Sequence, residues 1–237
     1  MRKMILLLLA FILIAILVQV IYTTYYLRKG SLLSQTVYSQ TYEAGDKIKP
    51  VFKVLVTGDS IAAGVGSSSF ETSVTGRIAN YLSENHHVIL KNGAYSGAKM
   101  ADLLNRPVSA EKQDLIVLIV SSNNLFRFTD LSEFKKATKE VLSRYSILTN
   151  KLIIVGPGRV FDAPALPWLL RQVYKIQAPK YAAIIGDEAK RYPNIIYINP
   201  INPPKSLPEY GHTLADDNFH PNDEGHRFWF DMIKTGL

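Results

Sequence analysis

The chain has 237 residues, of which 47% are hydrophobic and 20% are charged, and this composition excludes a disordered or collagen-like protein. It contains no cysteine, which excludes a disulfide scaffold, a thiolate zinc site, an iron–sulfur cluster and a cysteine nucleophile. The formal net charge is +7, but residues 1–30 hold four basic residues and no acid, so the rest of the chain carries 23 basic against 20 acidic residues. That bias is too weak to indicate a nucleic-acid partner, and we expect none.

Residues 4–22 form an apolar run in which only Gln19 is polar. A helix needs about 20 residues to cross a hydrocarbon core of about 30 Å, because each residue adds 1.5 Å. Tyr22, Tyr25 and Tyr26 follow, as interfacial anchors do, with no small-residue cleavage pattern. The sequence therefore predicts a single-pass transmembrane anchor over residues 1–29. We favour the short amino-terminal tail inside and the carboxyl-terminal bulk outside the cytoplasm, although the basic residues at the two ends nearly balance.

Residues 30–50 are polar and show no period, so we predict a linker there and a single domain over residues 51–237. Within this domain, short apolar runs rich in β-branched residues predict five strands. Continuous apolar runs of this kind are typical of parallel strands buried on both faces. The predicted strands cover residues 51–57, 88–90, 115–120, 152–155 and 195–198.

Helical patterns lie between these strands. The clearest covers residues 130–145, where Asp130 and Glu133 fit a capping box. Further helices are expected over residues 169–191 and after Pro221. Alternation of strands and helices predicts a three-layer α/β/α sandwich with a five-stranded parallel sheet, preceded by the transmembrane helix.

Four polar blocks follow strands or precede the last helix, at residues 58–60, 92–97, 121–124 and 217–220. In sheets of this class the ligand lies beyond the carboxyl ends of the strands, where these blocks would meet. Taken singly, each block is more typical of a turn or a helix cap than of a functional site. Together, at four corners of one topology, they indicate an active site.

The order and content of these blocks resemble the SGNH or GDSL family of serine esterases and lipases, and the resemblance covers about residues 52–236. It is closest to small bacterial single-domain acylhydrolases. The resemblance implies a flavodoxin-like fold with Ser60 as the nucleophile, and with His220 as the base that Asp217 orients. It also implies that Gly97 and Asn123 help to hold the oxyanion.

The chemistry of these residues is consistent with that assignment. A serine hydroxyl is a poor nucleophile until a base such as His220 takes its proton, and Asp217 would stabilise the resulting imidazolium. The amides of Ser60 and Gly97 and the side-chain amide of Asn123 supply three oxyanion donors, and a side chain at position 97 would obstruct substrate. No metal or cofactor motif is found, and we expect neither.

The third block departs from the family pattern Gly-x-Asn-Asp, because Ser121 and Asn124 replace the glycine and the acid. Loss of the glycine is expected to crowd the backbone, and loss of the acid removes a charged acceptor. Two nearby polar residues are interpreted differently. Asp216 is rejected as the partner of His220 because the three-residue spacing favours Asp217, and His226 is expected to be structural.

Aromatic residues near the predicted site are candidates for substrate binding. Phe126, Phe161 and Trp168 would line an acyl pocket or touch lipid, and the alternative is that they cap the core. The leading hypothesis is a membrane-anchored serine esterase acting on acyl or acetyl esters of lipids or envelope polysaccharides. An O-acyltransferase with the same triad and a non-catalytic, envelope-anchored binding domain are the alternatives.

Overall fold

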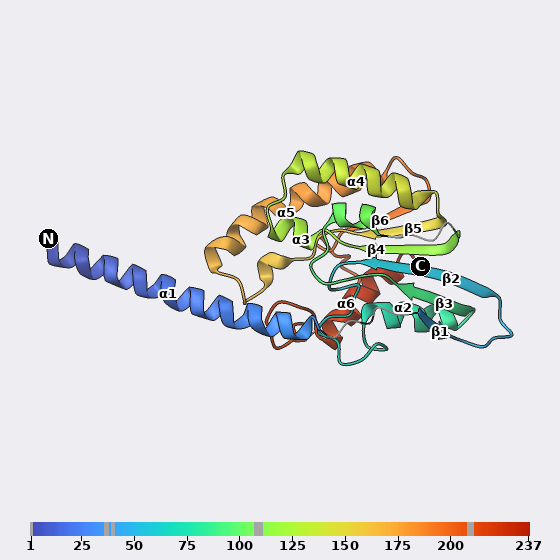
Figure 1. Cartoon of the computed structure of the whole chain (residues 1–237), viewed down its shortest axis with the longest axis horizontal. Coiled ribbons are helices and arrows are strands. Elements are labelled where there is room, and N and C mark those ends of the chain that lie inside the picture. Colours follow the sequence, from blue (N-terminus) through green and yellow to red (C-terminus); the bar gives the residue numbers. More distant parts are fainter. Residues whose placement is uncertain (1, 36–37, 39–40, 107–110, 208–210) are drawn as a thin grey trace.

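The computed structural model describes residues 2–35, 38, 41–106, 111–207 and 211–237 and combines one long helix with a layered α/β body (Figure 1). The helix α1 (Arg2–Leu33) projects from this body, and most of its length is exposed. The helical segment Lys3–Leu33 is long and apolar enough to cross a membrane. At 1.5 Å per residue these 31 residues span about 46 Å, so the helix extends beyond a hydrocarbon core of about 30 Å. It also continues past residue 29, where the anchor is predicted to end.

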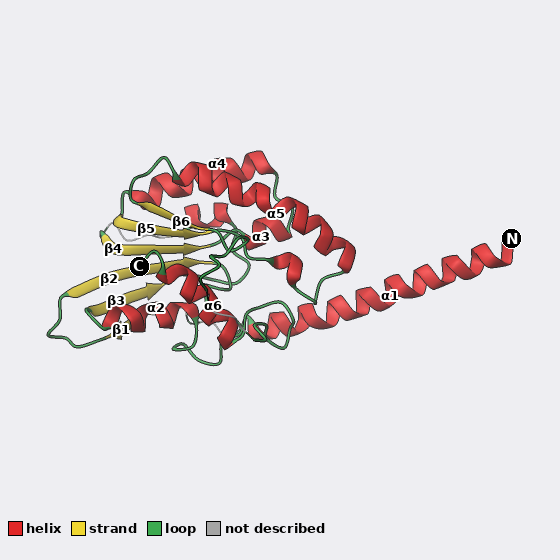
Figure 2. Cartoon of the chain, turned by 180° about the vertical axis from the view of Figure 1, so that it is seen from behind, coloured by secondary structure: helices red, strands yellow, loops and turns green. Residues whose placement is uncertain are grey.

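The sheet has six strands in the order β1-β3-β2-β4-β5-β6 (Figure 2). Strands β2 to β6 pair in parallel, which confirms the predicted α/β class and all five predicted strands. β1 runs antiparallel along β3 and is a sixth strand that the sequence does not predict. The bounds are β1 (Thr41–Ala44), β2 (Val51–Gly58), β3 (His87–Asn92), β4 (Gln113–Ile119), β5 (Thr149–Val155) and β6 (Ile195–Ile198).

β1 lies inside residues 30–50, which the sequence predicts as a linker. It pairs with the free edge of β3, from Thr41 opposite Lys91 to Ala44 opposite Val88. The ring of Tyr42 stacks on the ring of Phe70, with the centroids 3.4 Å apart. A strand of four residues is too short to show a clear period, so its sequence resembles that of a linker. The segment is therefore part of the sheet and covers an edge that would otherwise be open.

Helices cover both faces of the sheet. On one face lie α2 (Val74–Ser83) and α6 (Asp223–Lys234), and on the other lie α4 (Leu131–Ser146) and α5 (Trp168–Ala189). Alternate residues of β4 point into the two cores, because Val117 packs with α2 and α6, whereas Ile116 and Leu118 pack with α4 and α5. A strand between two cores must be apolar at every position, which explains the continuous apolar runs in the sequence.

The three predicted helices correspond to α4, α5 and α6. The Asp130 carboxylate caps α4 by accepting the amides of Ser132 and Glu133 at 2.8 and 3.2 Å. Three short helices lie in the connections that follow β3, β4 and β5, namely η1 (Met100–Asn105), α3 (Ser122–Phe126) and η2 (Val160–Asp162). Because β2 lies between β3 and β4 and all three are parallel, the loops that follow β2, β3 and β4 are neighbours at one edge of the sheet.

Candidate active site

Ser60 lies in the turn that follows β2. Gly58 permits this turn because its φ is +143°, and a Cβ there would lie 1.8 Å from the Ile119 carbonyl oxygen. The buried Asp59 carboxylate accepts the Ile61 amide at 3.1 Å, and burial raises the pKa of Asp59 to about 7. Ser60 is 7% exposed, and it lines a pocket at the edge of the sheet.

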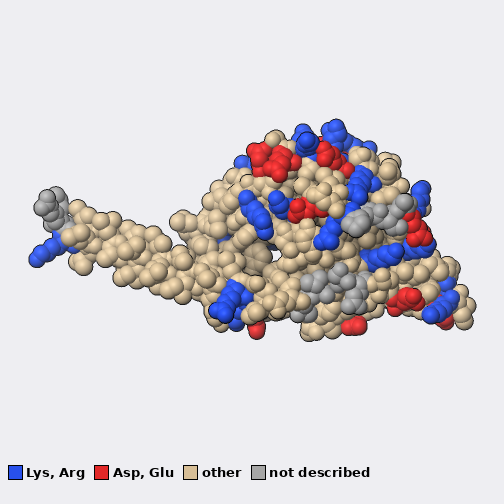
Figure 3. Space-filling model, viewed as in Figure 1, with Lys and Arg blue, Asp and Glu red and all other residues tan. Residues whose placement is uncertain are grey.

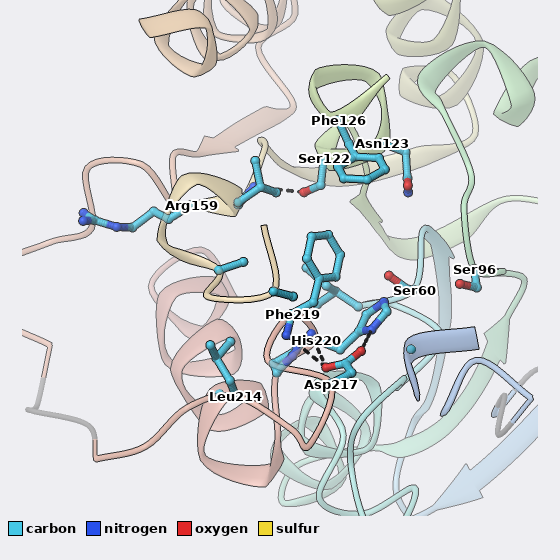
Figure 4. Close-up of a pocket in the computed structure, with 18 of the residues that line it drawn as sticks. Ser60, Ser96, Ser122, Asn123, Phe126, Arg159, Leu214, Asp217, Phe219 and His220 are labelled. Carbon is cyan, nitrogen blue, oxygen red and sulfur yellow. Dashed lines mark hydrogen bonds and ion pairs between the residues drawn. The ribbon is translucent and has the colours of Figure 1, made fainter. Parts of the chain in front are cut away.

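Asp217 and His220 form a hydrogen-bonded pair in the loop before α6 (Figure 4). Asp217 Oδ2 lies 2.5 Å from His220 Nδ1, and Oδ1 accepts the amides of Phe219 and His220 at 3.0 and 2.9 Å. Burial of Asp217 works to raise the pKa of its carboxyl, but the hydrogen bond and charge of His220 and the two amides outweigh burial and lower the pKa. Asp217 is therefore an ionised group that fixes the orientation of the imidazole.

The carboxylate of Asp217 does not cap α6. That role belongs to Asn222, whose side chain accepts the Gly225 amide at 3.0 Å. The neighbouring Asp216 is exposed, whereas Asp217 is fully buried against the imidazole. The helix cap and the partner of the histidine are therefore different residues. Asn222 caps α6, and Asp217 pairs with His220.

Ser60 and His220 face the same part of the pocket (Figure 4). Because Asp217 engages Nδ1, the second ring nitrogen, Nε2, is the one left for the serine hydroxyl. Within the described residues, no hydrogen bond joins Ser60 to His220. Contacts of this kind are often long without substrate and shorten in the substrate complex.

The three expected oxyanion donors line the same pocket. Gly97 has a φ of +83°, and a Cβ there would meet only an Arg127 nitrogen at 3.8 Å, so conformation rather than crowding requires glycine. In the described part of the chain, the amides of Ser60 and Gly97 have no acceptor. Asn123 Nδ2 donates to the Ala98 carbonyl at 3.1 Å, which leaves its second hydrogen available.

The two departures in the third block have different structural results. Ser121 has a φ of +111° and is fully buried, and its hydroxyl has no partner among the described residues. This is the strain expected where glycine is lost. Asn124 compensates for the lost acid, because its Oδ1 accepts the Met100 amide at 2.8 Å and its Nδ2 donates to Thr129 at 3.2 Å.

The pocket has a volume of about 630 Å³ and is bounded by loops that follow β2 to β5, by residues 213–221 and by the start of α6. Phe126, which follows the third block, lines it. The described residues that line it do not include Phe161 or Trp168. Phe161 is buried in the core, and Trp168 is 64% exposed on the outer side of α5.

One wall of the pocket comes from the carboxyl end of α1, through Tyr26, Leu27 and Gly30, and from Ser34 just after the helix. A Cβ at Gly30 would lie 2.9 Å from Asp217 Oδ2. Ser34 Oγ lies 3.0 Å from Ser96 Oγ, which joins the helix to the loop after β3. Sequence reasoning missed this wall, because nothing local in residues 26–34 indicates a contact with residues nearly 200 positions away.

His226 is structural, as its position suggests. Its Nδ1 accepts the Val74 amide at 3.3 Å, and its Nε2 lies 3.0 Å from the Val65 carbonyl oxygen. The ring therefore joins α6 to the start of α2 and to the loop that follows β2. Burial lowers the pKa of His226 to about 4. No group of three or more histidine and acidic side chains within the described ranges is placed to hold a metal ion.

Comparison with known proteins gives one family match and several related folds. The profile of the GDSL-like Lipase/Acylhydrolase family matches residues 56–228, a range that contains all four polar blocks. No curated protein matches the chain significantly. Among solved structures, a mutant of Axe2, an acetyl-xylooligosaccharide esterase from Geobacillus stearothermophilus, is 20% identical, with a TM-score of 0.59 over 81% of this chain and 96% of that one. An extracellular lipase from Streptomyces rimosus is 14% identical, with a TM-score of 0.56 over 78% and 100%.

The strained backbone at Ser121 leads to a stability prediction. Glycine tolerates a φ of +111° without the Cβ penalty, and the change removes a buried hydroxyl that lacks a partner among the described residues. We expect Ser121→Gly to raise the free energy of unfolding by about 1 kcal/mol. Denaturant unfolding of the full chain in detergent measures this change. A variant less stable than the wild type would contradict the strain argument, and Ser122→Gly, at a helical position, should be destabilising.

The buried His226 predicts a pH dependence of stability. The folded state holds this imidazole neutral down to about pH 4, whereas the unfolded chain protonates it below about 6.5, so stability falls as pH decreases through this window. Between pH 7 and pH 5 the wild type should lose about 2 kcal/mol more than His226→Asn. Asp59 titrates in both proteins, so the difference isolates His226. Equal losses in denaturant unfolding at the two pH values would exclude the assignment.

Proposed function

The chain belongs to the GDSL-like lipase/acylhydrolase family and is a carboxylic ester hydrolase, and we propose that it cleaves acyl or acetyl esters of lipids or envelope polysaccharides while anchored in a membrane by α1. The observation that carries the mechanism is the buried Asp217–His220 pair beside Ser60. Ser60 is the nucleophile, His220 is the base and Asp217 orients the base. This chemistry requires no cofactor.

The first half of the reaction forms an acyl-enzyme. Ser60 Oγ attacks the ester carbonyl carbon while His220 Nε2 takes the hydroxyl proton, and Asp217 stabilises the imidazolium. The carbonyl oxygen becomes negative and is bound by the amides of Ser60 and Gly97 and by the free side-chain hydrogen of Asn123. Each such donor contributes about 3–4 kcal/mol to the lowering of the barrier.

The second half of the reaction releases the products. The alcohol leaves with the proton held by His220, and water then attacks the acyl-enzyme with His220 again as the base. The acyl group leaves as a carboxylic acid, and Ser60 regains its proton. The same intermediate serves an acyltransferase when a sugar hydroxyl replaces water, so the acceptor alone distinguishes the two activities.

The proposed topology places the catalytic domain outside the cytoplasm. Figure 3 shows α1 as an uncharged surface with basic side chains towards its two ends. These are Lys3 at the amino end and Arg28 and Lys29 at the other. We expect that a reporter which works only outside the cytoplasm will be active when it is fused to the carboxyl terminus. Activity of a fused reporter only in the cytoplasm would reverse the orientation and leave the chemistry unchanged.

The nucleophile assignment predicts the outcome of covalent labelling. A fluorophosphonate should label the full chain at one serine, and Ser60→Ala should abolish both labelling and hydrolysis of p-nitrophenyl esters. Ser96→Ala is the matched control, because Ser96 lines the same pocket and should leave the labelling in place. Asp217→Asn should lower kcat by about 10³–10⁴ through loss of the correct tautomer. A folded wild type that neither reacts with the probe nor turns over any ester would support a non-catalytic binding domain.

A further inference from the structure

The first half of α5 exposes four large apolar side chains, together with the polar side chains of Gln172 and Lys175. Outside α1, eight large apolar side chains are exposed among the described residues, and four of them lie on the first three turns of α5. Leu169, Val173 and Ile176 recur at helical spacing on one stripe, where they are 72, 42 and 67% exposed. Trp168 adjoins them at 64%. The opposite side of α5 already packs on the core, so this second apolar face is not required by the fold.

A fifth exposed apolar side chain extends the same surface. The ring of Phe128 is 48% exposed and stacks on Tyr174 of α5, with the centroids 5.1 Å apart. Farther along α5 no large apolar side chain is exposed among the described residues, and Lys180 and Asp187 are exposed instead. We call Phe128, Trp168, Leu169, Val173 and Ile176 the apolar patch. Its restriction to one end of α5 indicates a boundary between two environments.

The apolar patch lies next to the part of α1 where the predicted membrane span ends. Pro167, which precedes α5, lines a small cavity together with Gln19, Val20, Thr23 and Thr24 of α1. Figures 1 and 2 both show the first turn of α5 as the part of the α/β body that reaches far along α1. If α1 crosses a bilayer, the start of α5 is therefore level with the lipid interface.

The catalytic pocket is also close to the end of the predicted membrane span, measured along α1. Tyr22 ends the apolar run, and Gly30 lies eight residues farther along α1, where an added Cβ would come within 2.9 Å of Asp217 Oδ2. Eight helical residues span about 12 Å, which is comparable to the depth of a headgroup layer plus a short gap. Tyr26 and Leu27 line the pocket between these two points. The α1 side of the pocket therefore begins within about 12 Å, along the helix, of the end of the apolar run.

We propose that the apolar patch is a membrane-docking surface, which inserts into the lipid interface beside α1 and presents the pocket to esters held in the bilayer. The occupant is lipid because the patch begins directly after Pro167, which lies against α1, and α1 is long and apolar enough to cross a bilayer. Its composition fits that role, with a tryptophan at the first position of α5, aliphatic side chains after it and the exposed basic side chain of Lys175 between Val173 and Ile176. The substrate part of this inference rests on the proposed hydrolase function, and the docking part does not.

Fluorescence quenching tests the docking part without any catalysis. The chain has two tryptophans, of which Trp229 is buried at 7% exposure and Trp168 is exposed. The full chain is reconstituted into phosphatidylcholine vesicles with bromine on the acyl chains. We expect the bromines to quench the wild-type emission, and most of the quenching to disappear in Trp168→Phe. Quenching that is unchanged in Trp168→Phe, or absent in both, overturns the proposal.

Activity against two esters tests the substrate part. Leu169→Glu combined with Ile176→Glu should lower the turnover of a long-chain ester dissolved in the vesicles by about tenfold or more, equivalent to about 1.4 kcal/mol. Turnover of p-nitrophenyl acetate in water should not change, because neither residue lines the pocket. Ile147→Glu is the matched control, since Ile147 is 72% exposed after α4, outside the patch. Equal effects on both esters, or no effect on either, contradict the proposal.

Two further outcomes are informative. A wild type that hydrolyses neither ester refutes the hydrolase function, and the quenching result then still decides whether the patch docks on lipid. Disulfide cross-linking between two copies of Ile176→Cys, together with absence of Trp168 quenching, would show that a second copy covers the patch and would overturn the proposal.

Discussion

A single buried hydrogen bond, between Asp217 and His220, constrains much of the surrounding structure. An ionised carboxylate without solvent needs several donors, and Asp217 obtains three from one ring nitrogen and two amides of its own turn. That turn must therefore end before α6 begins, which leaves the helix cap to Asn222. It also limits what can pack on the pair, since only a residue without a Cβ fits at Gly30. The tautomer that leaves Nε2 free for Ser60 follows from the same bond.

The third block shows how a site tolerates departures from its family pattern. Asn124 keeps the connection between α3 and the loop after β3, because an amide oxygen accepts the Met100 amide as a carboxylate oxygen would. Ser121 keeps the backbone path at the expense of a left-handed conformation and a hydroxyl with no partner among the described residues. Asn123, which lies between these two positions, lines the pocket wall. The departures therefore affect stability more directly than they affect the layout of the donors.

The features that can be predicted from the sequence share one property, a local pattern. Strands buried between two cores are apolar at every position, and the blocks around Ser60 and His220 have fixed spacings, so both are visible in the sequence. β1 is not predicted because four residues show no period. The pocket wall formed by Gly30 and Ser34 is not predicted because it depends on a long-range contact. The position of Trp168 after β5 associates it with the pocket, but the turn of α5 directs it outwards.

The close approach of Gly30 to the Asp217–His220 pair makes α1 part of the pocket as well as a candidate membrane span. A chain cut between α1 and β1 by a protease would lose a side of its binding cavity and expose the imidazole and carboxylate to water. We therefore expect removal of α1 to give an enzyme with a wider pocket opening and weaker selection among esters.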